Sequence, residues 1–204
     1  MSCNANDIVV LDFETTGLSP LQGDRAIEIG AVRIVDGVAV DRFQSLMNPG
    51  FKVSGFISQY TGISNTMLRQ APPCEEVMDG FADFIADSNL LAHNASFDKR
   101  FLDDELAHIQ RRYRGEFSCS LLVSRRIYPA APNHQLATLL KYANITADGD
   151  FHRALYDSEM TAKLWLALLQ TIGERCGLQQ VPFSLVKKLV KVPKKSVADF
   201  LAQW

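Results

Sequence analysis

The chain lacks closely spaced cysteines. Its four cysteines are scattered, and no two of them form a CxxC motif; they are Cys3, Cys74, Cys119 and Cys176. Zinc sites built on cysteine use pairs of ligands close together in the sequence, so this spacing argues against such a site.

Long apolar runs are also missing. No uninterrupted apolar stretch approaches the ~20 residues that cross a bilayer, and the amino terminus shows no charged region followed by an apolar signal core. Internal repeats and low-complexity segments are absent as well. We therefore expect a cytoplasmic protein with reduced thiols and no membrane partner.

Positive and negative charges nearly balance over the whole chain, but the two signs are unevenly distributed along the sequence. The 204 residues are 47% hydrophobic and 22% charged, with a formal net charge of -2, which is typical of a soluble globular protein. Residues 184–204 hold five lysines against one aspartate, a local charge of +4 that leaves -6 for the rest. We expect one domain over residues 1–176 and a basic C-terminal extension over 177–204. Such basic runs either bind phosphates or form a solvated face.

Apolar periodicity predicts an α/β fold. Period-two or continuous apolar segments predict strands at residues 8–13, 26–35, 38–47, 90–92 and 117–120. Helical spacing predicts helices at 57–60, 66–68, 75–86, from 98 onward, and at 121–127, 136–142 and 154–172. Asp36 and Gly37 predict a two-residue hairpin turn. Residues 177–182 resemble a linker, and Ser196 with Asp199 predicts a capping box before one last short helix.

Acidic residues occupy positions where apolar side chains are expected. Asp12 and Glu14 follow a buried strand in IVVLDFETTG, and residues two apart on a strand share a face. Asp98 in HNASFD and Asp157 in HRALYD each begin a helix and lie on its apolar stripe, and His152 precedes the last acid. Buried carboxylates are costly unless a positive group faces them, so their convergence predicts bound cations and a metal-dependent phosphodiesterase.

These motifs resemble the three ordered motifs of the DEDDh 3'-5' exonucleases in the ribonuclease H-like superfamily. The motifs are DFET, HNASFD and HRALYD, and AIEIGAV, TGIS and LATLLKYANI fit between them. The resemblance covers residues 8–169 and includes the DNA polymerase III proofreading epsilon subunit, ribonuclease T and oligoribonuclease. It implies a ribonuclease H-like fold with a central mixed five-stranded sheet flanked by helices. The segment from residue 177 onward matches no part of the group.

The resemblance also implies the chemistry. Two hard divalent cations, Mg²⁺ or Mn²⁺, are expected at oxygen ligands and aid in-line attack on phosphorus. By resemblance, Asp12 bridges both ions, Glu14 and Asp157 hold the ion that carries the attacking water, and Asp98 supports the second ion. His152 accepts the proton from that water, which a neutral imidazole can do near neutral pH.

Further residues receive smaller roles. Thr15 and Leu18 directly follow the metal ligands and, by resemblance, contact the terminal sugar and the last base. Phe97 is expected in the core, and His93 with Asn94 is expected to hold the turn before the helix at Asp98. The remaining two histidines, His108 and His134, are expected in ordinary surface or loop positions.

Substrate and partners stay open at this level. The family removes nucleotides from 3' ends, and single strands fit best because a terminal nucleotide must enter a pocket. DNA is favoured, with an RNA-trimming or oligoribonuclease-like enzyme and a non-catalytic polymerase-associated module as alternatives. Residues 179–183 weakly resemble a sliding-clamp peptide, so a clamp or a DNA polymerase is a candidate partner. A haloacid dehalogenase-type phosphatase would need a second Asp where this chain has Glu14.

Overall fold

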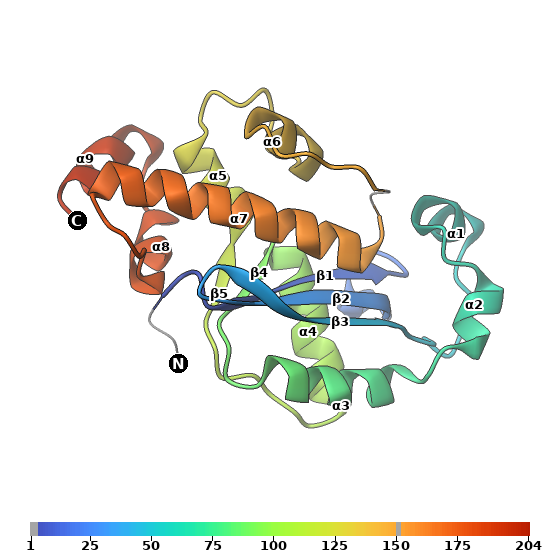
Figure 1. Ribbon diagram of the computed structural model, residues 1–204. Helices are drawn as coiled ribbons and strands as arrows, with labels where there is room; N and C mark the ends of the chain where they lie inside the picture. The colour runs from blue at the N-terminus through green and yellow to red at the C-terminus, as the bar shows by residue number, and fades with distance from the viewer. Residues whose placement is uncertain (1–3, 150–151) are drawn as a thin grey trace.

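A single mixed sheet separates two helical layers in the computed structural model, which describes residues 4–149 and 152–204 (Figure 1). The strands are β1 (Ile8–Thr15), β2 (Ala26–Val35), β3 (Val38–Leu46), β4 (Leu90–Ala92) and β5 (Phe117–Cys119). They lie in the order β3-β2-β1-β4-β5, with β1, β2 and β3 antiparallel and β1, β4 and β5 parallel. This confirms the α/β fold with a mixed five-stranded sheet. Cys3 lies outside the described residues.

The helices follow the periodicity of the sequence over most of the chain. They are α1 (Gly55–Thr61), α2 (Asn65–Gln70), α3 (Cys74–Ile85), α4 (Ser96–His108), α5 (Ser120–Ile127), α6 (Leu136–Tyr142), α7 (Ala154–Cys176), α8 (Phe183–Leu189) and α9 (Val197–Ala202). Two 3₁₀ turns, Pro20–Gln22 and Lys194–Ser196, complete the fold. None of the helices seen in the structure combines the length and apolarity needed to span a bilayer.

Two local predictions have different outcomes. Asp36 and Gly37 have φ values of 49° and 77°, so the predicted hairpin turn with two positive-φ residues is confirmed. The capping box is wrong, because the Ser196 side chain makes no cap hydrogen bond. Ser196 has a ψ of 4°, since the 3₁₀ turn runs directly into α9, whereas a side-chain N-cap needs an extended residue.

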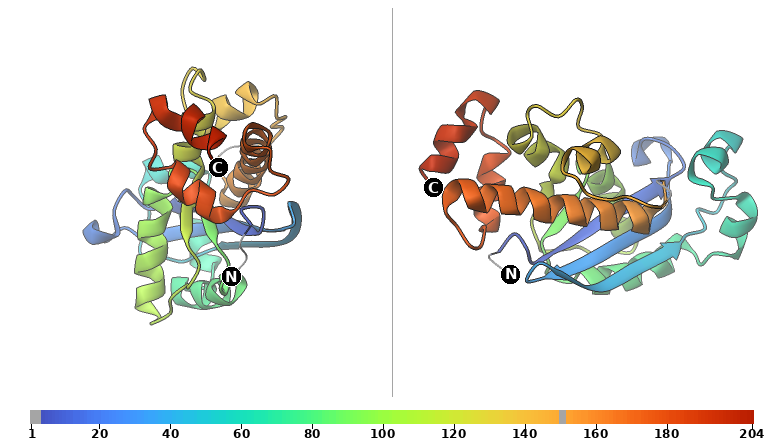
Figure 2. Two further views of the ribbon diagram at one scale, coloured as in Figure 1. Left: turned by 90° about the vertical axis from the view of Figure 1, so that its left-hand side faces the viewer. Right: turned by 45° about the horizontal axis from the view of Figure 1, so that its top comes forward.

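Alternate residues of β1 face two different cores. Ile8 and Val10 pack with the α7 side of the sheet, where Trp165 is fully buried. Val9 and Leu11 pack on the opposite side with α3 and α4. Figure 2 shows α7 crossing one face of the sheet while α3 and α4 cover the other. The even-numbered positions at the end of β1 therefore face the first turn of α7.

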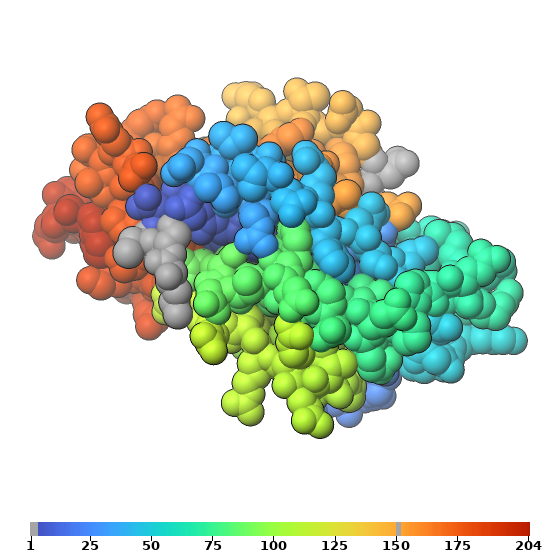
Figure 3. All heavy atoms as spheres, turned by 60° about the horizontal axis from the view of Figure 1, so that its bottom comes forward, coloured from blue at the N-terminus to red at the C-terminus, as the bar shows by residue number. Residues whose placement is uncertain are grey.

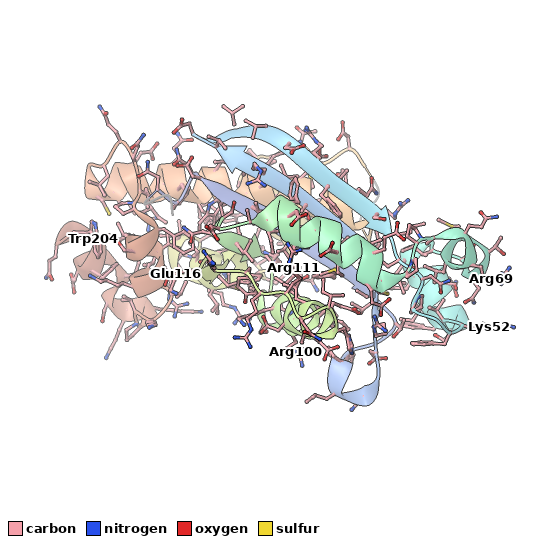
Figure 4. The ribbon with its side chains drawn as sticks, turned by 90° about the horizontal axis from the view of Figure 1, so that it is seen from below. Lys52, Arg69, Arg100, Arg111, Glu116 and Trp204 are labelled. Atoms are coloured by element: carbon pink, nitrogen blue, oxygen red, sulfur yellow. The ribbon has the colours of Figure 1, made fainter. Side chains whose placement is uncertain are left out.

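The layer of α3 and α4 closes the second face of the sheet. Figure 3 views this layer from outside, with the β2–β3 hairpin exposed beside it. Arg111, just after α4, donates hydrogen bonds to Asp79 at 2.7 Å and to Asp83, both on α3, and Figure 4 shows it beside α3. These bonds fix the end of α4 opposite the end that carries Asp98.

The C-terminal extension packs into the core beside α7. Buried apolar side chains from this segment join the cluster that contains Trp165; they are Val181, Phe183, Leu185, Val186, Leu189, Val197 and Leu201. The backbone N–H of Ala5 donates to the Val181 carbonyl at 2.8 Å. Burying one such side chain contributes about 1.5–3 kcal/mol, so these residues stabilise the fold. The sequence pattern did not predict α8.

Candidate active site

Four carboxylates line one cavity at the carboxyl end of β1. The cavity has a volume of about 750 Å³ and lies where β1, α1, α4 and the start of α7 meet. The acids are Asp12, Glu14, Asp98 and Asp157. The structure thus brings together the four acids that the sequence singled out, from three separate elements.

The alternation of β1 places the first two acids. Asp12 pairs with Gly30 of β2, and Glu14 pairs with Glu28, so both acids project on the α7 side of the sheet. Phe13 projects to the other side and is buried in the second core. The predicted paired orientation of Asp12 and Glu14 is therefore present in the fold.

Asp98 reaches the cavity from the first turn of α4. Its side chain is buried, and its Oδ1 accepts a hydrogen bond from the Phe13 backbone N–H at 3.2 Å. The position at a helix amino terminus favours a negative charge. The bond to β1 fixes Asp98 next to Asp12 although the two residues are far apart in the sequence.

A glycine in β2 lets α7 approach the sheet closely enough to deliver Asp157. A Cβ at Gly30 would lie only 2.0 Å from the backbone nitrogen of Leu155. The Ser158 hydroxyl donates to the Gly30 carbonyl at 2.8 Å and fixes the first turn of α7 on β2. Any larger residue at position 30 would push Asp157 away from Asp12, which lies opposite Gly30 in the sheet.

His152 is held at the edge of the same cavity. Its backbone N–H donates to Asp157 Oδ2 at 2.9 Å, and its ring centroid lies 4.2 Å from that of Tyr60 on α1. Its φ of 70° is in the left-handed region, which is uncommon for a non-glycine residue and is often found at functional sites. Sequence reasoning did not identify Tyr60, because its position beside His152 depends on where α1 packs.

An ion pair between a buried acid and a partly exposed arginine fixes the segment that carries His152. Glu28 is fully buried in β2 and accepts hydrogen bonds from Arg153 at 2.9 and 3.2 Å and from the Ala154 backbone N–H at 3.2 Å. Sequence reasoning missed this pair. The signal was present as a single acid inside the apolar strand AIEIGAV, since a buried acid requires a partner.

Burial raises the pKa values of the acids, and repulsion between them adds to this effect at Asp12 and Glu14. Burial, together with the charges of Asp157, Glu28 and Asp98, raises the pKa of Glu14 to about 8. Burial raises the pKa of Asp98 to about 7, and burial followed by repulsion from Asp98 and Asp157 raises the pKa of Asp12 well above its usual range. Without a positive group among them, these acids resist ionisation at neutral pH.

The donor set fits a hard divalent cation. The Oδ1 atom of Asp157 is buried and has no hydrogen-bond partner among the residues that the structure describes. Potential ligand atoms of Glu14, His152 and Asp157 lie within 4.8 Å of one another. Carboxylate oxygens are the ligands that Mg²⁺ and Mn²⁺ prefer. A cation here would satisfy the unpaired oxygen and offset the repulsion between the acids.

Both predicted substrate contacts line the cavity. Thr15 is buried and donates through its hydroxyl to the Gly17 carbonyl at 2.7 Å, while Leu18 is 76% exposed. Both line the cavity, as do Phe56 and Tyr60, whose rings stack with centroids 6.0 Å apart. Phe56 is 73% exposed, so an apolar surface borders the acids. The sequence did not single out Phe56.

His93 braces the turn before α4. Its Nε2–H donates to the His134 carbonyl at 3.0 Å, so its Nδ1 accepts from the Ser120 hydroxyl at 2.8 Å. Burial lowers the pKa of His93 to about 4, which keeps the ring neutral. Asn94 follows with a φ of 66°. These contacts fit the expected structural role of His93 and Asn94.

Comparison with known proteins agrees with this geometry. The RNase_T exonuclease family model matches residues 9–165, which include all four acids and His152. The chain belongs to this exonuclease family. Its resemblance to the DEDDh group is confirmed, and it has the exonuclease domain of a family of phosphodiester hydrolases that depend on divalent metal ions.

The similar curated proteins are much longer than this chain. DNA polymerase III PolC-type of Bacillus subtilis is 39% identical over 174 residues, which are 84% of this chain and 12% of that protein. The 3'-5' exonuclease DinG of Bacillus subtilis is 32% identical over 203 residues, covering 96% of this chain and 20% of that protein. The chain therefore spans only a small part of the length of these relatives.

Solved structures share the fold over nearly the whole chain. Exonuclease X in complex with 5' overhanging duplex DNA superposes with a TM-score of 0.67 at 25% identity and covers 96% of this chain and 99% of its own. The nuclease domain of 3'hExo, a DEDDh family member bound to rAMP, has a TM-score of 0.69 at 21% identity, covering 88% of this chain and 98% of its own. The ribonuclease H-like fold expected from the motifs is confirmed.

Proposed function

We propose that this chain is a 3'-5' exonuclease that hydrolyses single-stranded nucleic acid, DNA in preference to RNA, and releases nucleoside monophosphates. The observation that carries the proposal is the meeting of four carboxylates from β1, α4 and α7 in one cavity, with His152 beside them. The exonuclease family supports the reaction type. The direction, the strand and the product are inferred for this chain.

Two divalent cations, Mg²⁺ or Mn²⁺, would be held by Asp12, Glu14, Asp98 and Asp157. When bound, such cations polarise phosphoryl oxygens, lower the pKa of water and neutralise charge on the leaving oxygen. The protein supplies preformed ligands at fixed positions, because Asp98 is bonded to β1 and Asp157 to the turn at His152. Asp157 Oδ1 is a buried ligand atom with no hydrogen-bond partner in the described part of the chain.

His152 accepts the proton of the attacking water in this proposal. Tyr60 limits the rotation of the imidazole by ring contact, and Asp157 fixes the backbone that carries it. The Glu28–Arg153 pair anchors the adjacent residue. His152 is exposed, so the accepted proton can pass to solvent.

The cavity mouth suits an unpaired terminal nucleotide. Leu18, Phe56 and Tyr60 present apolar and aromatic surface on which bases can stack without reading their identity. Thr15 lies deeper, next to Glu14, where the terminal sugar would be placed. Because this surface is tolerant of sequence, we expect trimming that depends little on the base.

DNA is favoured because the curated relatives that this chain resembles include PolC-type DNA polymerases. RNA trimming remains the second candidate, since the fold also matches a 3'-exonuclease solved with a histone mRNA stem-loop at a TM-score of 0.70. The similarity to PolC-type DNA polymerases also makes a DNA polymerase the favoured protein partner. A sliding clamp is not favoured, because Val181 and Phe183, the apolar residues of the candidate clamp peptide, are buried in the core.

The test compares 5'-labelled single-stranded DNA, single-stranded RNA and blunt duplexes of equal length, each with Mn²⁺, with Mg²⁺ and with chelator. We expect a ladder of shortened products from the 3' end, fastest on single-stranded DNA, and none in chelator. An Asp12→Asn variant with an unchanged circular dichroism spectrum serves as the inactive control. Cleavage that persists in chelator or in this variant would contradict the proposal, as would an intact substrate in every arm.

A further inference from the structure

The C-terminal extension is hydrogen-bonded to α5 by a half-buried arginine. Arg126 donates through Nε to the Val192 carbonyl at 3.0 Å and through Nη1 to the Leu122 carbonyl at 2.9 Å. The residue before it, Arg125, is exposed. Figure 2 shows the extension lying against α5 at one end of the molecule. One arginine thus holds the extension in place, and its neighbour faces solvent beside it.

Three exposed cations lie on the two segments that the Arg126 hydrogen bonds join. Arg125 lies on α5, and Lys194 and Lys195 lie on the 3₁₀ turn before α9; we call these three residues the α5 basic patch. Other lysines of the extension have different contacts. Lys187 pairs with Glu116 at 2.8 Å, and Lys188 lies over the Trp204 ring at 4.6 Å, toward the face seen in Figure 4.

Helix α5 links the basic patch to the wall of the cavity, because its first residue, Ser120, is hydrogen-bonded to His93, which lines the cavity. His93 lines the cavity and is hydrogen-bonded to His134, and His134 lies within the electrostatic reach of the patch. Burial lowers the pKa of His134, and the positive charges of Lys194 and Arg125 lower it further. Arg125 acts on His93 in the same direction. Arg125 and Lys194 therefore place positive charge near the α5 wall of the cavity.

A polyanionic substrate needs such a surface, because the cavity itself is acidic. Residues 184–204 have a formal charge of +4, whereas the rest of the chain has -6. We propose that the α5 basic patch binds the phosphate backbone of the strand whose 3' end occupies the cavity, upstream of the nucleotide being removed. This inference rests on the proposed function and adds the path that the substrate follows to it.

The test variant combines Arg125→Gln, Lys194→Gln and Lys195→Gln. It removes the patch and leaves the cavity and the hydrogen bonds of Arg126 unchanged. The control combines Arg112→Gln, Arg114→Gln and Lys163→Gln. These three exposed cations lie between α4 and β5 and on α7, so the net charge change is the same.

Binding is measured in chelator, where no turnover is expected, by fluorescence anisotropy of labelled DNA from 3 to 20 nucleotides over a series of salt concentrations. We expect wild-type affinity to rise with length and the patch variant to lose about tenfold for the 20-mer at low salt. The slope of log K against log salt should fall by about 2, because each single-strand phosphate contact contributes about 0.7. The trimer should bind the patch variant and the wild type equally.

Turnover gives a second measurement that separates this inference from the proposed function. In Mn²⁺ the patch variant should raise KM for the 20-mer and leave both kcat and trimer hydrolysis unchanged. Equal effects in the control triple, or no effect in the patch variant, would overturn the inference and leave the patch as a surface for an acidic protein. Failure of the wild type to cut any oligonucleotide would instead reject the proposed function, and the anisotropy slopes would still decide the patch.

Discussion

Removing the charge of Asp157 should stabilise the metal-free protein while it abolishes the stabilisation by metal ions. In the metal-free fold, burial and then the charges of Asp157, Glu28 and Asp98 raise the pKa of Glu14 from 4.5 to about 8. A raised acid pKa means that the folded state holds a proton which the unfolded state has lost. The contribution of Glu14 to the free energy of unfolding therefore falls as the pH rises from 4.5 to 8.

The size of the effect follows from the shift. One pKa unit corresponds to about 1.4 kcal/mol, so full ionisation of Glu14 costs the metal-free fold on the order of 5 kcal/mol relative to acidic pH. The costs at Asp98 and Asp12 are not additive with it, because the groups titrate together. Asp157→Asn removes one of the charges that raise the pKa of Glu14, and its melting temperature at pH 8 without metal should exceed that of the wild type.

Adding a divalent cation should reverse the order of the two melting temperatures, so that the wild type melts above Asp157→Asn. A ligand present at 100 times its Kd stabilises the folded state by about 2.7 kcal/mol, and about 2–4 °C per kcal/mol is expected for a chain of this length. The wild type should therefore gain roughly 5–11 °C in Mn²⁺, and Asp157→Asn should gain little.

The assay is differential scanning fluorimetry at pH 6 and pH 8, with chelator or with Mn²⁺. Glu159→Gln is the matched control, because it removes a charge from the same helix but pairs with Arg42 at 2.6 Å outside the cavity. This control should retain the full gain in Mn²⁺. An equal metal-induced gain in Asp157→Asn and the wild type would refute the reasoning, since it would show that the ion is not held by this acid.

Three further predictions concern residues around the acids. Tyr60→Ala should lower kcat about tenfold, because the imidazole of His152 loses the ring that orients it. Tyr60→Phe should retain the wild-type kcat. An equal loss of kcat in both variants would show that the hydroxyl of Tyr60 matters instead. Glu28→Ala should lower the free energy of unfolding by about 3 kcal/mol, since Arg153 and a buried backbone N–H lose their acceptor, and a urea midpoint that does not move would disprove this. His93 has a pKa lowered from 6.5 to about 4 by burial. The stability that the neutral ring contributes should therefore be lost as the pH falls from 6.5 to 4, by about 3 kcal/mol in total. His93→Gln should flatten the dependence of stability on pH there, and an unchanged profile would contradict the assignment.

The extension illustrates how charge and packing can serve different purposes in one segment. Its apolar side chains are buried beside α7, while Lys194 and Lys195 are exposed beside α5. The alignments with DinG and with Exonuclease X each cover 96% of this chain and so include residues of the extension. The α5 basic patch experiment addresses the role of the extension directly.

Local signals in the sequence were sufficient for much of the fold. The apolar run before Asp12, the alternation through β2 and β3, and the Asp36–Gly37 turn predicted the hairpin and the central strand, because strand pattern and turn residues act over a few positions. The helix that carries Asp157 was predicted from spacing in the same way. The short helix α8 was not predicted, although α6, which is also seven residues long, was; the segment of α8 was interpreted only as part of the basic extension.

The same local rules identified the acids but not their surroundings. Asp12, Glu14, Asp98 and Asp157 stood out because each is an acid in an apolar context, which is a property of sequence. Gly30 as the contact point for α7 was not predicted, because a glycine in a strand has several explanations and only the packed helix shows which applies.

What the sequence by itself determined was the set of acids, the elements that hold them and the family to which the chain belongs. Only the tertiary structure decided that Tyr60 contacts His152, that Glu28 binds Arg153, and that the C-terminal extension lies against α5. The physical reason is the range of each interaction. Periodicity and turn preferences depend on neighbours within a few residues, whereas these contacts join segments separated by dozens of residues and exist only after the sheet and both helical layers have packed.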